Sequence, residues 1–393
     1  MLDARALWLV PGLAHPVFSG FAEFFRSVFR RFEALDYRDA YLHVGQGGVE
    51  RRVEERITTT KPELLIYTQF PSSYSYLVPE FIGKLRQRCL VVGLGFDDEI
   101  YFEQSKFFYS YCDAVITTDI PGAERLRAAG IPVHLGALQQ PHVSVAMGQA
   151  TVEDIPISFV GDMNKPGRRE FIRALDAAGI AVADYGAGSR NGRLSDAQML
   201  DVFRRSRINL NFTRTNPPAW VLRHYPDRAH TGQIKGRPFE LASLGRFCLC
   251  EWAPCVDYWF RPGDEIGIFR DTEELVGAAK RYLVDEPLRG RIAAAAHHRY
   301  CVEYAPKVQF ERIFSTILAD TSRDRRIDPL QTDAIFYESM GRSKGVAFLH
   351  ALRRAEPLKA LRQFRGDGSS ELDFWRGFMG GMTDALANLA KSR

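Results

Sequence analysis

Two cationic side chains and a glycine occur together in the segment Lys235-Gly-Arg-Pro-Phe-Glu240, immediately ahead of a helical pattern. Pro238 suits the first position of a helix, because its φ is fixed at a helical value and its missing N–H would have no partner there. Gly245 ends this helix before a strand. The free N–H groups at a helix start favour an anion, and Lys235 and Arg237 would add charge-assisted hydrogen bonds. The segment therefore predicts a binding site for a diphosphate.

Gly236 and Glu240 complete this expected site. Gly236 allows the backbone to approach a phosphate closely, and Glu240 lies one helical turn further on, placed to accept hydrogen bonds from a ribose. Such a site would stabilise the charge on a departing nucleotide diphosphate without a metal ion. The alternative is that Lys235 and Arg237 are solvated surface charges and that Glu240 only complements the helix dipole.

A second cationic loop, Gly161-Asp-Met-Asn-Lys-Pro-Gly-Arg-Arg169, follows the apolar run Ile157–Val160. The order of strand, glycine loop from Gly161, arginine and helix places Arg168 or Arg169 at the same edge of a parallel sheet. Either side chain would clamp the same phosphates, and we favour Arg168. For Arg169 the alternative is an ordinary residue in the first turn of a helix.

A third loop, Tyr185-Gly-Ala-Gly188, follows another apolar run. Tyr185 and Gly186 would pass close to a nucleobase, since parallel strands end at a common edge. No pair of carboxylates along the chain has a convincing metal-ligand spacing, so we expect no metal site and no cofactor beyond the donor substrate itself.

Candidates for proton transfer lie in the first half of the chain. His15 occurs in the loop after the first apolar run and would serve as a base or as a hydrogen-bond donor, with a plain loop residue as the alternative. Asp97 and Asp98 follow a later strand, and either one would remove a proton from the hydroxyl of a second substrate. For both aspartates the alternative is capping a helix.

Apolar runs of strand length alternate with helical patterns, as in parallel sheets covered by helices. The first half predicts strands at Ala6–Val10, Ala40–Val44, Leu64–Tyr67, Cys89–Gly93, Ala114–Thr117 and Val133–Leu135, and helices at Phe21–Leu35, Gly48–Thr58, Val78–Arg86 and Gly122–Ala129. The second half predicts strands at Ile157–Val160, Ala181–Tyr185, Ile208–Phe212, Arg246–Cys250 and Ile266–Phe269, and helices at Arg169–Ala178, Asp196–Arg205 and Pro238–Leu244. Ser195 and Gln198 predict a capping box for the middle helix.

These elements predict an α/β protein with two doubly wound, Rossmann-like domains that face each other across a cleft. Residues 1–145 would form the first domain, 146–156 a linker and 157–323 the second domain. Residues 324–393 contain no strand-like run and predict a C-terminal helical appendage. The aromatic stripe Phe374-Trp375-Phe378 in this appendage would dock on a membrane surface, on a partner or second copy, or on the chain itself.

The composition limits the class of protein. Of the 393 residues, 46% are hydrophobic and 25% charged, which is typical of a globular chain. The net charge of +4 argues against a general nucleic-acid binder. No apolar stretch is long enough for a transmembrane helix, and no secretion signal is apparent, so we expect a cytoplasmic protein. The six cysteines, including the cluster Cys248, Cys250 and Cys255, predict reduced thiols rather than disulfides or metal ligands.

The second half resembles a known family. The motifs that carry the resemblance are Ile157-Ser-Phe-Val-Gly161, Tyr185-Gly186 with Asn191-Gly-Arg-Leu-Ser195, Ile208-Asn-Leu-Asn-Phe212, Lys235-Gly-Arg-Pro-Phe-Glu240 and Pro262-Gly-Asp-Glu-Ile266. They are similar to the C-terminal domain of CgeB-like (spore maturation protein type) glycosyltransferases, which resemble the broader group-1 GT-B transferases. The resemblance implies donor binding by Arg168, Lys235, Arg237 and Glu240. In the wider group a Glu-x7-Glu pair contacts the donor; Glu240 matches its second member, but Gly232 stands at the first.

The resemblance implies a GT-B glycosyltransferase that moves a sugar from a nucleotide-diphosphate sugar, with UDP or GDP as the nucleotide, to a saccharide, lipid-linked or protein acceptor. Gly232 leaves the sugar and the stereochemical outcome open. Two alternatives remain: an epimerase-like GT-B enzyme, and a GT-B binding or assembly subunit without catalysis. The helical appendage would add a homo-oligomer contact or peripheral contact with the inner face of the membrane.

Overall fold

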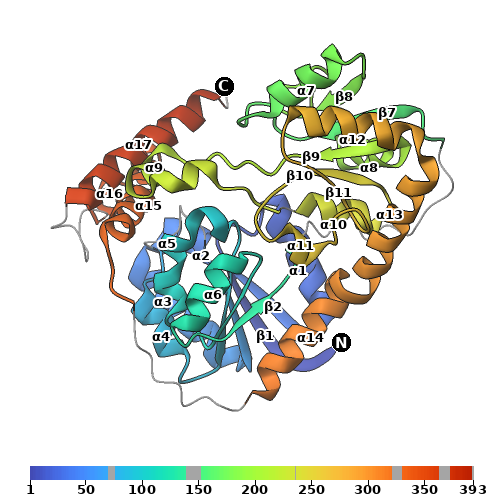
Figure 1. The fold of residues 1–393 in the computed structure, drawn as a ribbon. Coiled ribbons are helices and arrows are strands. Elements are labelled where there is room, and N and C mark those ends of the chain that lie inside the picture. The colour runs from blue at the N-terminus through green and yellow to red at the C-terminus, as the bar shows by residue number, and fades with distance from the viewer. Residues whose placement is uncertain (70–75, 139–151, 235, 321–329, 363–371, 392–393) are drawn as a thin grey trace. The chain divides into compact units, whose positions relative to one another are not determined.

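The chain forms two compact units, one made of residues 1–136 and 310–393 and the other of residues 137–309. The computed structural model describes residues 1–69, 76–138, 152–234, 236–320, 330–362 and 372–391. Each unit is an α/β layer structure in which helices cover one parallel sheet (Figure 1).

The sheet of the first unit has six parallel strands in the order β2-β1-β3-β4-β5-β6. Its strands are β1 (Leu2–Val10), β2 (Phe29–Asp36), β3 (Leu64–Thr68), β4 (Leu90–Leu94), β5 (Ala114–Thr117) and β6 (Val133–Leu135). Its helices are α1 (Pro16–Val28), α2 (Tyr37–Val44), α3 (Gln46–Thr60), α4 (Pro79–Leu85), α5 (Asp98–Tyr109), α6 (Ile120–Ala128), α15 (Ala334–Arg353), α16 (Pro357–Arg362) and α17 (Leu372–Lys391). Helix α14 (Pro306–Ala319) begins in the second unit and continues into the first.

The second unit has five parallel strands in the order β11-β10-β9-β7-β8. The strands are β7 (Ile155–Val160), β8 (Val182–Tyr185), β9 (Ser206–Asn211), β10 (Cys248–Glu251) and β11 (Gly267–Phe269). The helices are α7 (Arg168–Ala177), α8 (Asp196–Arg205), α9 (Ala219–His224), η3 (Pro226–His230), α10 (Gly236–Ser243), α11 (Val256–Trp259), α12 (Thr272–Val284), α13 (Glu286–Arg299) and η4 (Tyr300–Tyr304). The expected capping box of α8 is present.

The strand order reverses once in each sheet. In the first unit β1 lies between β2 and β3, and in the second unit β7 lies between β8 and β9. The chain leaves each of these strands on one side and returns on the other, so the loops at the carboxyl ends diverge and leave room for a ligand. The loops after β7 and β9 therefore form the natural binding position of the second unit.

The central strands were predictable because both of their faces are buried. Strands β3 and β4 are buried along their whole length, so each is a continuous apolar run. The prediction of a strand at Ala40–Val44 was wrong, since this segment belongs to helix α2. Its buried residues Tyr37, Ala40 and Tyr41 follow helical spacing, and Asp36 caps the helix by accepting a hydrogen bond from the Asp39 backbone N–H.

The true second strand is β2, which lies inside the segment expected to be a helix, Phe21–Leu35. Strand β2 is at the edge of the sheet and pairs only with β1. Its arginines Arg30 and Arg31 are exposed and Phe29 is buried, so the strand lacks the apolar run of a central strand. Helix α5 was not predicted at all.

The C-terminal helices belong to the first unit. Phe336 of α15 and Phe374 and Phe378 of α17 are buried in the same apolar core as the sheet. The expected aromatic stripe therefore packs on the chain's own first unit, apart from Trp375, whose exposed fraction is 37%. No helix in the described ranges is both long and apolar enough to cross a membrane.

Glycines allow α15 and α17 to cross with their backbones in contact. A Cβ atom on Gly341 would lie 1.9 Å from the Phe374 carbonyl oxygen, and one on Gly345 would lie 2.1 Å from that of Phe378. On α17, a Cβ on Gly381 would lie 2.1 Å from the Arg342 carbonyl oxygen. Real Cβ atoms do not approach backbone oxygens this closely, so the crossing requires glycine.

Polar groups are also buried at the carboxyl edge of the first sheet. The Asp98 carboxylate is 1% exposed and accepts hydrogen bonds from the Tyr109 hydroxyl (2.8 Å) and the Thr117 hydroxyl (2.7 Å). Burial raises the pKa of Asp98 to about 7, and the neighbouring charge of Asp119 also raises it. Burial likewise raises the pKa of Glu99 well above its ordinary value.

We expect Gly341→Ala to lower the free energy of unfolding of the first unit by about 2 kcal/mol, because the added methyl group forces the two helices apart. The measurement is denaturant unfolding followed by circular dichroism. The matched control is Gly47→Ala in helix α3, where the nearest atom to a Cβ is the Arg51 Nη1 at 3.7 Å. That change should be neutral or should stabilise by up to about 1 kcal/mol. Equal effects of the two changes would contradict the close crossing.

Asp98 should make the stability of the first unit fall as the pH rises. The folded carboxyl holds its proton up to about pH 7, whereas the unfolded one releases it near 3.8, so the folded state binds more protons between these values. We expect Asp98→Asn to reduce the decline in the free energy of unfolding between about pH 4 and pH 7, measured by denaturant titration at several pH values. Glu99 should leave a residual slope. Parallel curves for the two proteins would contradict a buried, proton-binding Asp98.

Candidate functional site

Arg168 is a buried cation at the point where the second sheet reverses its strand order. It is the first residue of α7, follows the loop after β7 and is 5% exposed. Its Nη1 donates to the Asp162 carbonyl oxygen (2.8 Å) and its Nη2 to the Phe212 carbonyl oxygen (3.5 Å). The guanidinium carbon lies 5.2 Å from the centre of the Phe159 ring.

The charge of Arg168 is only partly compensated. Among the described residues, its Nε has no hydrogen-bond partner and no carboxylate lies within ion-pair distance. Burial lowers the pKa of Arg168 to about 10, although Asp162 and Glu251 oppose this change. Because burying a cation costs free energy, an anion bound at this edge would be favoured.

Arg237 and Glu240 form an ion pair within helix α10. The guanidinium of Arg237 lies 4.5 Å from the Phe203 ring and its Nη2 is 3.4 Å from the Val160 carbonyl oxygen, so it reaches the carboxyl end of β7. The carboxylate of Glu240 is 4% exposed, and Arg237 is the partner that the described contacts show for it. A ribose that contacted Glu240 as expected would therefore bind a carboxylate that is already paired with Arg237.

The start of α10 differs slightly from the expectation. The helix begins at Gly236, so Pro238 occupies the third position rather than the first. Proline is tolerated there because the N–H groups of the first turn have no partner within the helix. Lys235 lies outside the described residues. The start of α10 nevertheless lies at the same edge as Arg168, since the Arg237 Nη2 is 3.4 Å from the Val160 carbonyl oxygen at the end of β7.

The loops after β7 and β8 are joined to each other through glycines. The Gly161 N–H donates to the Tyr185 carbonyl oxygen (2.8 Å), and the Met163 N–H donates to that of Ala187 (2.8 Å). Gly186 has a φ of 121°, and a Cβ there would lie 2.1 Å from the Gly161 carbonyl oxygen. Both glycines thus serve loop-to-loop packing, and the expected approach of Tyr185 and Gly186 to a nucleobase stays a prediction.

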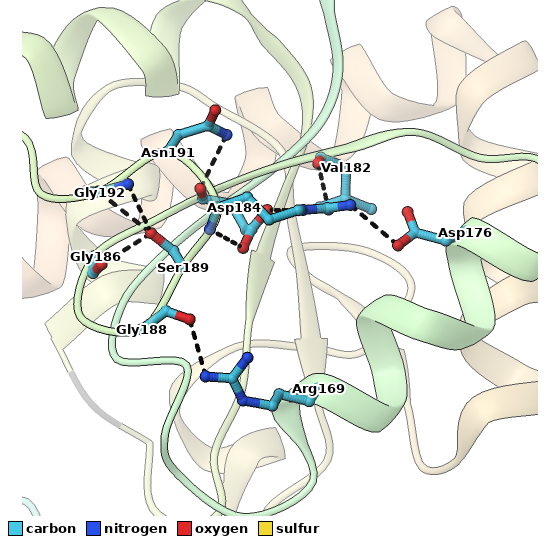
Figure 2. Close-up of polar contacts among 10 residues, drawn as sticks. Arg169, Asp176, Val182, Asp184, Gly186, Gly188, Ser189, Asn191 and Gly192 are labelled. Carbon is cyan, nitrogen blue, oxygen red and sulfur yellow. Dashed lines mark hydrogen bonds and ion pairs between the residues drawn. The ribbon is translucent and has the colours of Figure 1, made fainter.

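Polar contacts centred on Asp184 connect the residues of the loop after β8 (Figure 2). The Asp184 carboxylate accepts a hydrogen bond from the Arg190 N–H (3.0 Å) and pairs with the Arg190 guanidinium, which also reaches Asp176 at 3.1 Å. The Asn191 side chain donates to the Asp184 carbonyl oxygen (3.1 Å). The sequence pattern indicated only the glycines of this loop, although the charges at 184 and 190 determine its shape.

Arg169 also stabilises the loop after β8 through hydrogen bonds. Its Nη2 donates to the Gly188 carbonyl oxygen at 2.9 Å (Figure 2). The same Nη2 also donates to the Asn164 side-chain oxygen at 3.2 Å. The two arginines that follow the β7 loop thus differ: Arg168 is buried at the strand ends, whereas Arg169 reaches across to the loop after β8. Of these two, Arg168 is the better candidate for an anion site.

Arg214 and Glu251 lie at the same edge and were missed by sequence reasoning. Glu251 ends strand β10, is 3% exposed and accepts a hydrogen bond from the Thr213 N–H (2.9 Å). Its carboxylate forms an ion pair with Arg214, whose Nε lies 2.6 Å away. The signal that could have found them is a charged residue directly after the apolar run of each strand.

Gly232 stands where the related transferases have the first glutamate of their pair. A Cβ at this position would lie 3.2 Å from the Ala253 Cβ and 3.4 Å from the Pro254 Cδ. The segment after β10 therefore packs closely against Gly232. Gly232 is also the partner of Arg214 in an antiparallel β-bridge. The residue opposite this glycine is thus a cation.

The candidate residues of the first unit lie on two loops of one sheet edge. His15 caps α1 by accepting a hydrogen bond at Nδ1 from the Val17 N–H (3.4 Å), so its Nε2 carries the proton, and the side chain is exposed. The first turn of α1, which His15 caps, and the loop after β4 meet through Phe18 and Phe96, whose ring centres are 5.7 Å apart.

The two aspartates after β4 have different surroundings. Asp97 is partly exposed and has a left-handed backbone with φ of 56°. Asp98 is buried and its carboxylate oxygens accept hydrogen bonds from Tyr109 and Thr117. His15 is therefore exposed and Asp97 partly exposed, whereas Asp98 is part of the interior.

Comparison with known proteins agrees with this fold. Residues 168–315 match a family model described as glycosyl transferase-like. No curated protein sequence matches the chain significantly. The match begins at Arg168, the first residue of α7, and includes the loop after β9, α10 and the helices that follow.

Several solved structures share the architecture. A sucrose-phosphate synthase from Thermosynechococcus elongatus is 11% identical with a TM-score of 0.55, over 81% of this chain and 100% of that one. A glycosyltransferase from Rickettsia africae is 9% identical with a TM-score of 0.54, over 82% and 100%. The Anabaena protein HepE, in complex with UDP and glucose, is 11% identical with a TM-score of 0.51, over 81% and 100%.

These likenesses show the two-sheet GT-B fold, to which this chain adds a helical C-terminal region, and the family match is consistent with glycosyl transfer. The narrower CgeB-like identity stays a prediction. The chain therefore has the GT-B fold, and its residues 168–315 match a glycosyl transferase-like family model, which supports a transferase.

Proposed function

We propose that the chain transfers a sugar from a nucleoside-diphosphate donor to an acceptor hydroxyl and that the diphosphate binds at the carboxyl edge of the second sheet. The observation that carries the proposal is the buried, incompletely compensated guanidinium of Arg168 beside Arg237 and the start of α10. A diphosphate would supply the missing negative charge.

Transfer breaks the bond between the anomeric carbon and the distal phosphate and forms a bond from that carbon to the acceptor oxygen. Negative charge then develops on the departing diphosphate. Arg168, Arg237 and the N–H groups at the start of α10 would stabilise this charge, and because they are held in place before the reaction, little reorganisation is needed. The same groups would replace a divalent metal in this role.

A nucleoside diphosphate is also the donor chemistry seen with a protein of the same fold, since HepE was solved with UDP and glucose. Glu240, paired with Arg237, would accept a hydrogen bond from the ribose with its second oxygen. The loop after β8, with Tyr185 and Gly186, would face the base. The acceptor would be a saccharide, a lipid-linked group or a protein.

The acceptor proton would pass to Asp97, and His15 would donate a hydrogen bond from Nε2. Support for these roles comes from their exposure on adjoining loops of the first unit. Asp98 would act on this edge only indirectly, through the packing of α5, since its carboxylate is enclosed.

We expect Arg237→Gln to weaken binding of a nucleoside diphosphate by about 1.5–3 kcal/mol, the contribution of a charge-assisted hydrogen bond. The measurement is isothermal titration with UDP, GDP and ADP. The matched control is Arg246→Gln: Arg246 is ion-paired to Glu153 and 16% exposed, against 21% for Arg237, but it precedes β10 at the opposite edge of the sheet. Wild-type affinity in the first variant would remove Arg237 from the site.

Chelation should leave donor binding unchanged, because arginine side chains and helix N–H groups supply the positive charge. We expect the same dissociation constant for the preferred nucleoside diphosphate with and without excess EDTA. A loss of about tenfold or more, equivalent to about 1.4 kcal/mol, that Mg²⁺ or Mn²⁺ restores would contradict metal-independent binding.

A further inference from the structure

Arg214 has the geometry of an anion-binding side chain that no internal contact fully uses. It follows β9, the strand next to β7, so it lies at the position where the strand order of the second sheet reverses. Its side chain is 44% exposed, whereas the carboxylate of Glu251 behind it is 4% exposed. The Nε of Arg214 faces Glu251, so the exposed part of the Arg214 side chain is the guanidinium edge on the other side.

Contacts within the chain restrict the side chain of Arg214. Its Nε lies 2.6 Å from a Glu251 oxygen, and its guanidinium carbon lies 4.9 Å from the centre of the Phe171 ring. The backbone N–H of Arg214 donates to the same carboxylate (3.3 Å). A guanidinium fixed on one side by a carboxylate and on its face by a ring loses little conformational freedom when it binds an anion.

The two Nη groups of Arg214 donate no hydrogen bond within the described part of the chain. Nη1 lies beside Gly167, since a Cβ built on that glycine would be 2.5 Å from it. Gly167 is the residue immediately before α7, which starts with Arg168. The uncommitted edge of Arg214 thus lies at the positive end of a ten-residue helix and next to a buried cation.

The residue opposite Arg214 across the β-bridge brings no negative charge to this position. It is Gly232, where an added Cβ would lie 3.2 Å from the Ala253 Cβ. A carboxylate suits neutral hydroxyl groups, because it accepts their hydrogen bonds, whereas a guanidinium fork suits oxyanions. The donor group that meets this position should therefore carry negative charge.

We propose that Arg214 binds an oxyanion of the donor, through the guanidinium edge left free by Glu251. The proposal rests on the proposed function of the same edge. Two parts of a donor offer this chemistry: the distal phosphate, or a carboxylate on the sugar, as in a uronic acid. In either case Glu251 acts as the positioning residue of Arg214.

The test is isothermal titration of the wild-type chain, Arg214→Gln and a matched control with three probes: the nucleoside diphosphate that the wild type binds best, its glucose ester and its glucuronic acid ester. The control is Arg205→Gln. Arg205 is 39% exposed and ion-paired to Asp154 and Asp201, but it precedes β9, whereas Arg214 follows that strand. Arg205→Gln should leave all three affinities unchanged.

We expect Arg214→Gln to weaken binding about tenfold or more, as for loss of a charge-assisted hydrogen bond. Weakening with all three probes assigns the distal phosphate, and weakening confined to the glucuronic acid ester assigns the sugar carboxylate. Wild-type affinity of Arg214→Gln for every probe would overturn the inference and leave the proposed function standing. Failure of the wild type itself to bind any probe would overturn both.

A second variant guards against misfolding, since Arg214→Gln leaves the buried Glu251 without its cation. The double change Arg214→Gln with Glu251→Gln removes both charges and should restore the wild-type melting temperature without restoring affinity. Wild-type affinity in the stably folded double variant would also overturn the inference.

Discussion

A buried guanidinium without a carboxylate of its own is the constraint on which the carboxyl edge of the second sheet depends. Carbonyl oxygens from the loops after β7 and β9 and the faces of two phenylalanine rings surround Arg168. These groups compensate the charge only in part, because dipoles and ring faces contribute less than a full negative charge. The interior cation therefore makes this edge attractive to anions, and Arg214 and Arg237 beside it add to that preference. A transferase whose leaving group is a diphosphate needs such an edge.

The loops around this cation are fixed mainly by contacts with each other. Gly161 and Gly186 allow the backbones of two loops to lie in contact. The ion pair of Asp184 with Arg190 stabilises the loop after β8, and Figure 2 shows the contacts of Asp184. Contacts of this kind restrict the loops, and restricted loops lose less conformational entropy when a ligand binds. The first unit follows the same principle at its own sheet edge: Phe18 and Phe96 join the loops that carry His15 and Asp97, and helices α15 and α17 complete the core beneath.

Sequence patterns were informative where the physical cause is local. Strands buried on both faces, such as β3 and β4, are continuous apolar runs, and the cap of α8 is a set of residues three apart. Strand β2 was not predicted, because an edge strand exposes one face to water and the exposed arginines of β2 interrupt the apolar run. The candidate anion site was predictable for the same local reason. An arginine or a lysine that follows a strand and begins a helix indicates a phosphate site, and this pattern does not depend on the rest of the fold.

By itself, the sequence determined the α/β class, most of the strands, the helical C-terminal region and the position of Arg168 and Arg237 at strand-to-helix junctions. Only the tertiary structure decided the partners of these charges. It paired Glu240 with Arg237, took Asp98 into the interior, and brought Arg214 and Glu251 to the edge beside Arg168. The physical reason is that periodicity and capping act over a few residues, whereas the neighbours of a loop depend on strand order. Placing β7 between β8 and β9 is a non-local choice, made by the packing of whole strands and helices.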